Sequence, residues 1–130
     1  MARILVIDDD EAIRTVVTLL LSQKGHVVES AKNGRQGFKA AEDRNFDLLI
    51  VDIFMPEMDG LETIRLLRTA MPYLPVIVIS GSNAAMPDFL SMATKLGAIE
   101  SLRKPFRPNE LLEIVDMCLA FGAKRVAKSS

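Results

Sequence analysis

The sequence predicts an α/β protein with a doubly wound, five-stranded parallel sheet in the order 2-1-3-4-5. Three expected strands are almost entirely apolar, at residues 3–7 (after Arg3), 48–51 and 75–79, as in strands that are buried on both faces of a parallel sheet. Segments with helical periodicity follow the strands at the spacing of β-α-β units. The other two expected strands, at residues 26–29 and 99–102, contain more polar residues. They are therefore suited to the two edges of the sheet.

Length and composition indicate one ordinary globular domain. The chain has 130 residues, of which 49% are hydrophobic and 25% charged, and its formal net charge is -1. This balance gives no support for binding nucleic acid or a membrane through general electrostatics. The single cysteine, Cys118, and the lack of a signal segment or long apolar run favour a reducing cytoplasm. We expect the folded domain at residues 1–121 and a solvated tail at 122–130.

Each strand is expected to lead into a helix. The first helix starts at Glu11 and ends near Gly25, and Asn33-Gly34 turns the chain into the second. Pro87 lies in the first turn of the fourth helix and Pro108 opens the last. The third helix runs from residue 60 to 71, and the whole pattern is that of a flavodoxin-like (βα)5 domain.

Charged and polar residues follow four of the five expected strands. They converge at one rim because parallel strands end at the same sheet edge: Asp8, Asp9, Asp52, Ser80 and Lys104. Carboxylate ligands open to water suit Mg²⁺, which also binds phosphate oxygens. A carboxylate can accept a phosphoryl group, and a lysine and a hydroxyl can hold its oxygens.

Four other residues are expected to have structural roles and no part in the chemistry of the site. Asp10 and Asp59 precede helices and are predicted to cap them. His26, the only histidine, is expected to have a surface or packing role, and Cys118 is expected in the core.

The motifs together resemble the receiver domain of two-component response regulators, of the single-domain type. The resemblance covers residues 3–120, and the matching motifs are residues 4–10, Asp52 with Met55-Pro56 and Met58-Asp59-Gly60, Ser80, and Lys104-Pro105-Phe106.

The resemblance implies a role for each site residue. Asp52 would accept a phosphoryl group from a histidine kinase or a histidine phosphotransfer protein. Asp8, Asp9, Asp52 and the backbone carbonyl of Phe54 would hold Mg²⁺. Ser80 and Lys104 would bind the phosphoryl group, and the Lys104-Pro105 peptide bond would be cis.

It also implies a signalling domain of a bacterial cytoplasm that catalyses only its own phosphorylation and dephosphorylation. Output would pass to a partner protein through the fourth helix, fifth strand and fifth helix. The last helix is apolar nearly all round, so one of its sides could form the interface of a homodimer. Neither direct nucleic-acid binding nor membrane binding is expected.

The chain departs from the family pattern in three places. It has two extra residues between Ser80 and Gly97, and Ser101 stands where an aromatic switch residue is common. Phe54 and Ser82 are not the polar pair of members that dephosphorylate rapidly, so a long phosphoryl lifetime is predicted.

Two other functions remain open at this stage. A small Mg²⁺-dependent phosphatase or phosphotransferase could use the same aspartyl-phosphate chemistry, although position 54 is Phe and no cap segment is present. The chain could also be a receiver fragment of a larger transcriptional regulator. A nucleotide-binding module is disfavoured because the sequence has no glycine-rich phosphate loop.

Overall fold

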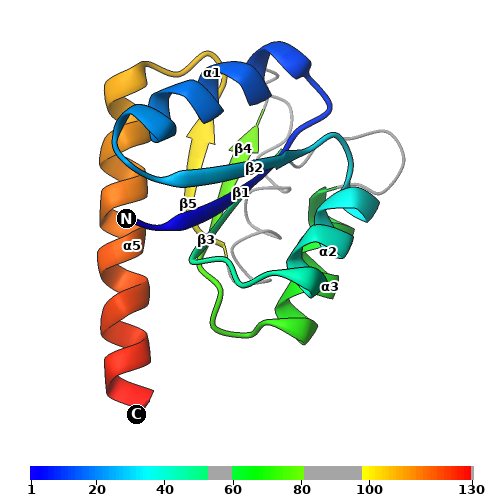
Figure 1. The fold of residues 1–130 in the computed structure, drawn as a ribbon, viewed down its shortest axis with the longest axis vertical. Helices are drawn as coiled ribbons and strands as arrows, with labels where there is room; N and C mark the ends of the chain where they lie inside the picture. The colour runs from blue at the N-terminus through cyan, green and yellow to red at the C-terminus, as the bar shows by residue number, and fades with distance from the viewer. Residues whose placement is uncertain (53–59, 81–97, 130) are drawn as a thin grey trace.

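The chain forms an open parallel sheet with helices on both faces (Figure 1). A computed structural model describes residues 1–52, 60–80 and 98–129. The strand order is β2-β1-β3-β4-β5, so the predicted order and fold class are confirmed. The strands, close to their expected positions, are β1 Arg3–Ile7, β2 Val27–Ala31, β3 Leu48–Asp52, β4 Val76–Ser80 and β5 Ala98–Arg103.

The described helices begin where the capping signals predict. They are α1 Glu11–Gln23, α2 Gly34–Asp43, α3 Gly60–Ala70 and α5 Pro108–Ser129. The Asp10 carboxylate accepts a hydrogen bond from the backbone of Ala12 at 2.9 Å, which confirms Asp10 as the cap of α1. Gly25 follows α1 with a φ of 87°, a conformation that favours glycine. The expected fourth helix at Pro87 and the predicted cap Asp59 lie outside the described residues.

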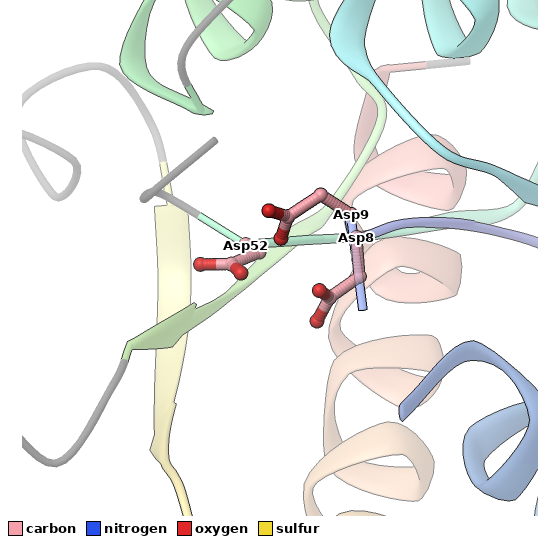
Figure 2. A group of neighbouring side chains, drawn as sticks. All are labelled: Asp8, Asp9 and Asp52. Carbon is pink, nitrogen blue, oxygen red and sulfur yellow. The ribbon is translucent and has the colours of Figure 1, made fainter. Parts of the chain in front are cut away.

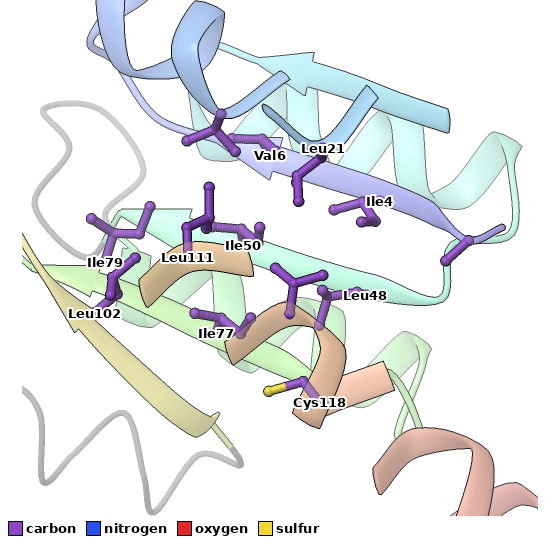
Figure 3. Packing of buried hydrophobic residues seen from close by; sticks show 13 residues of the cluster. Ile4, Val6, Leu21, Leu48, Ile50, Ile77, Ile79, Leu102, Leu111 and Cys118 are labelled. Atoms are coloured by element: carbon purple, nitrogen blue, oxygen red, sulfur yellow. The ribbon is translucent and has the colours of Figure 1, made fainter. Parts of the chain in front are cut away.

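Alternate residues of each strand face opposite layers of the core. In β3, Leu49 and Val51 pack with α2 and α3, whereas Leu48 and Ile50 belong to the cluster beneath α1 and α5 (Figure 3). This second cluster contains Cys118, so its predicted core position is confirmed. The interior strands β1, β3 and β4 are buried on both faces, which is why they read as continuous apolar runs.

The last helix is longer than the sequence indicated. The backbone of α5 stays helical to Ser129, through the segment 122–130 that we expect to be a solvated tail, and that solvation stays a prediction. In Figure 1 its final turns extend past the lower edge of the domain. Ala, Lys and Arg dominate this segment and are strong helix formers, and one internal glycine costs only about 1 kcal/mol.

His26, the histidine expected to have a surface or packing role, is half-buried. Its Nδ1 atom accepts a hydrogen bond from the backbone N–H of Ala2 at 3.2 Å, in keeping with a packing role. Among the helices of the described segments, none is long and apolar enough to cross a membrane.

Candidate functional site

Strand register brings two of the predicted acids together at the carboxyl edge of the sheet. In the pairing of β1 with β3, Ile4 lies beside Leu48 and Ile7 beside Val51. The next residue after Ile7 is Asp8, and the next residue after Val51 is Asp52. Both continue the alternation that faces the α1 and α5 layer, so the fold directs two carboxylates into the same space.

Asp8 is fixed through both its backbone and its side chain, and it has no exposed surface. Its N–H donates to the carbonyl of Ala31 at 3.1 Å, and its Oδ1 accepts from the N–H of Asp10 at 2.9 Å. Its own carbonyl accepts from the guanidinium of Arg14 at 2.6 Å. Oδ2 is buried, and the ammonium of Lys104 lies 3.0 Å away.

Lys104 directly follows β5, the edge strand beyond β4, and its ammonium group pairs with both carboxylates. Its Nζ atom lies 3.0 Å from Oδ2 of Asp8 and 3.2 Å from Oδ2 of Asp52. Its backbone N–H donates to the carbonyl of Ser80 at 2.8 Å, which anchors the end of β5 to the end of β4. The peptide bond between Lys104 and Pro105 is cis, the configuration that the resemblance implies.

The ionisation of the site reflects burial and crowding. Burial raises the pKa of Asp8, and the nearby charge of Asp52 adds to the shift, which outweighs the hydrogen bond from Asp10 and the attraction of Lys104. Burial alone would lower the pKa of Lys104, but its hydrogen bonds and charge interactions with Asp8 and Asp52 raise it. The lysine therefore stays charged, and the acid cluster carries excess negative charge that is costly without another cation.

The donor set of this cluster fits a hard divalent cation. One carboxylate oxygen from each of Asp8, Asp9 and Asp52 lies within 4.8 Å of the others. Figure 2 shows the three side chains gathered at this edge of the sheet. All the donors are oxygen, Asp9 is open to solvent, and the only cation beside the buried Oδ2 of Asp8 among the described residues is the ammonium of Lys104. Such a site suits Mg²⁺, which binds through one or two carboxylates and keeps several waters.

The structure thus brings together Asp8, Asp9, Asp52 and Lys104, as the sequence predicted. Ser80 is buried at the last position of β4, beside the same edge. The carbonyl of Phe54 and the side chain of Ser82 lie outside the described residues, as do all of residues 81–97.

Two other positions bear on the site. Ser101, which stands where an aromatic switch residue is common in receiver domains, is exposed on β5. Sequence reasoning overlooked Arg14, whose contact with Asp8 is described above. Its position four residues after the helix cap Asp10 was the available signal, because it places the side chain one helical turn along, over the acidic loop.

The fold and this edge define a flavodoxin-like α/β domain that presents a lysine-paired acid cluster. Residues 4–116 match the response regulator receiver domain, and the chain belongs to that family. It is a signalling domain of two-component response regulators.

Relatives of known sequence or structure agree with this assignment. The chain is 39% identical over 118 residues to the DNA-binding transcriptional regulator NtrC of Azospirillum brasilense, covering 91% of this chain and 24% of that protein. Its fold matches chemotaxis protein CheY4 of Vibrio cholerae with a TM-score of 0.85 and 31% identity, covering 91% and 98% of the two chains. NtrX from Brucella abortus matches with a TM-score of 0.93 and 30% identity, covering 98% and 29%.

The relatives differ in overall length. The chain spans 24% of the NtrC relative and 45% of the transcriptional regulatory protein PhoP of Bacillus subtilis. The receiver domain therefore occurs in this family both inside longer regulators and, as in CheY4, as nearly the whole of a chain.

Proposed function

We propose that Asp52 is the phosphoacceptor of this receiver domain and that Mg²⁺ is required for the transfer. The observation that carries the proposal is the position of Asp52 at the end of β3, within 4.8 Å of the Asp8 and Asp9 ligand atoms and 3.2 Å from Nζ of Lys104. A nucleophilic carboxylate with cationic groups beside it is what phosphoryl transfer to an aspartate requires.

In the proposed reaction, an oxygen of the Asp52 carboxylate attacks the phosphorus of a phosphohistidine on a kinase or phosphotransfer protein. The O–P bond forms as the P–N bond breaks, and the histidine nitrogen leaves with the bonding electrons. Lys104 pairs with the phosphoryl oxygens, and the hydroxyl of Ser80 donates a hydrogen bond to them. A cation held by Asp8, Asp9, Asp52 and the Phe54 carbonyl would neutralise part of the phosphoryl charge.

Output is proposed to pass through the face formed by the fourth helix, β5 and α5. Phosphorylation adds nearly two negative charges beside Lys104, and this biases any equilibrium in which the lysine and the end of β5 move together. Met117 on α5 is 59% exposed, which suits contact with a downstream protein or a second copy of the chain. The second candidate function is that of a receiver domain within a larger transcriptional regulator. The length of the NtrC and PhoP relatives supports it.

The test is phosphorylation by a small acyl-phosphate donor, read by intact mass. Wild type should gain one phosphoryl group with Mg²⁺ and none with excess chelator, and Asp52→Asn should gain none. Asp47→Asn is the matched control because Asp47 precedes the same strand at the opposite edge, where its carboxylate accepts from the N–H of Arg3 at 2.8 Å. Persistent modification of Asp52→Asn would overturn the assignment.

The same samples test the phosphoryl lifetime predicted from Phe54 and Ser82. After the donor is removed, we propose that the modified mass persists for minutes or longer. Decay within seconds would contradict this. Steady release of phosphate from added phosphoesters would instead favour the phosphatase alternative.

A further inference from the structure

The guanidinium of Arg14 contacts the one peptide that joins two proposed metal ligands. Arg14 lies in the second turn of α1, and its NH1 group donates to the carbonyl oxygen of Asp8 at 2.6 Å. That carbonyl belongs to the peptide between Asp8 and Asp9. The contact is partly buried, which strengthens a charge-assisted hydrogen bond over one in open water.

This peptide carries the backbone from which the Asp9 side chain extends. The N–H and side chain of Asp8 are held independently by Ala31, Asp10 and Lys104. Asp9 is exposed, so packing does little to fix it. The contacts of Asp8 do not depend on its carbonyl, so a change in the Asp8–Asp9 peptide would act chiefly on the backbone that carries Asp9.

We propose that Arg14 is a positioning residue that locks this peptide and thereby sets the geometry of the cation site. It acts through the backbone and is not itself a ligand. This inference rests on the proposed Mg²⁺ binding described above. Groups that orient metal ligands in this way typically contribute 10- to 100-fold in metal affinity.

The sign of the effect separates positioning from simple electrostatics. A positive charge beside a cation site repels the cation, so removing Arg14 for its charge alone should tighten Mg²⁺ binding. Loss of positioning should weaken it. The two explanations therefore predict opposite changes in the same measured constant.

The experiment compares Mg²⁺ dissociation constants by isothermal titration calorimetry. Arg14→Met keeps an unbranched, though shorter, side chain and removes the donor and the charge, and Arg14→Lys keeps a charged donor. Arg35→Met is the matched control because it removes the same charge from an exposed position in the first turn of α2. Melting without Mg²⁺ shows whether each variant folds, and Arg14→Ala replaces Arg14→Met if the latter does not.

We expect Arg14→Met to weaken Mg²⁺ binding by about 10-fold or more, Arg14→Lys to restore most of the affinity, and Arg35→Met to leave it unchanged or slightly tighter. Unchanged or tighter binding in folded Arg14→Met or Arg14→Ala would overturn the positioning role. Failure of the wild type to bind Mg²⁺ would instead overturn the proposed function, so the two failures are distinguishable.

Discussion

The ammonium of Lys104 lies 3.0 Å from Oδ2 of Asp8, a carboxylate with no exposed surface. The lysine therefore supplies a positive charge to the same acids that are proposed to bind Mg²⁺. If Mg²⁺ binds as proposed, Lys104 and the metal would compete for the negative charge of the same acids.

Lys104→Met should destabilise the metal-free protein and tighten Mg²⁺ binding. The substitution leaves the buried Asp8 charge without its ion-pair partner, for which we expect a loss of about 1–3 kcal/mol in unfolding free energy. It also removes a competing cation, so the Mg²⁺ dissociation constant should fall roughly tenfold. Urea unfolding with chelator and calorimetric titration check the two effects. Weaker Mg²⁺ binding in Lys104→Met would contradict the competition.

Asp8→Asn should stabilise the metal-free domain and abolish its stabilisation by Mg²⁺. Because the folded state raises the pKa of Asp8, the ionised carboxylate is disfavoured there, and a neutral amide avoids the penalty. We therefore expect a higher free energy of unfolding for Asp8→Asn than for wild type near neutral pH.

The pH dependence of that gain follows from the sign of the shift. Protonated Asp8 contributes stability that is fully present below the unfolded pKa of 3.8 and is lost as the pH rises through the raised folded value. The advantage of Asp8→Asn over wild type should therefore be small near pH 3.5 and larger at pH 7. Urea unfolding of both proteins with chelator measures it. An equal difference at both pH values would argue against a raised pKa.

Gly37→Ala should destabilise the domain although alanine favours helices. A Cβ atom at this position of α2 would overlap Cδ1 of Ile7 and lie 2.7 Å from its Cγ1, and Ile7 is fully buried in β1. Overpacking costs about 1–3 kcal/mol, which exceeds the gain in helix propensity. Thermal unfolding measures the loss. In the Ile7→Ala background the same substitution should cost much less, and equal costs in both backgrounds would refute the clash.

Cys118 should be inert in the folded protein at pH 8. Burial, with a smaller contribution from the charge of Glu100, raises the pKa of its thiol from 9.0 to about 11. The stability contributed by the protonated thiol is present below pH 9 and is lost as the pH rises through about 11. This loss amounts to at most about 2–3 kcal/mol.

A thiol reagent such as a chromogenic disulfide should therefore label native Cys118 slowly and label the unfolded protein at once. Unfolding of wild type and Cys118→Ala between pH 8 and 11 isolates the contribution of the thiol, since only wild type can lose it. Rapid labelling under native conditions would show that the thiol is accessible.

The sequence alone determined the fold class and most of the site. Continuous apolar runs mark interior strands because both of their faces are buried, and the polar edge strands follow by contrast. Acids at the ends of two such strands had to share one rim, since parallel strands end together. Local capping residues such as Asp10 and Gly25 also fixed helix ends, because a cap acts within a few residues.

Only the tertiary structure decided how the site residues face one another. The register of β1 with β3 places Asp8 beside Asp52, and the packing of β5 on β4 brings Lys104 to both. The contact of Arg14 with the Asp8 carbonyl depends on how α1 lies over the sheet. These relationships join segments far apart in the chain, so no local pattern encodes them. The helical end of α5 was missed for a related reason: one glycine is a weak stop signal when its neighbours favour helix.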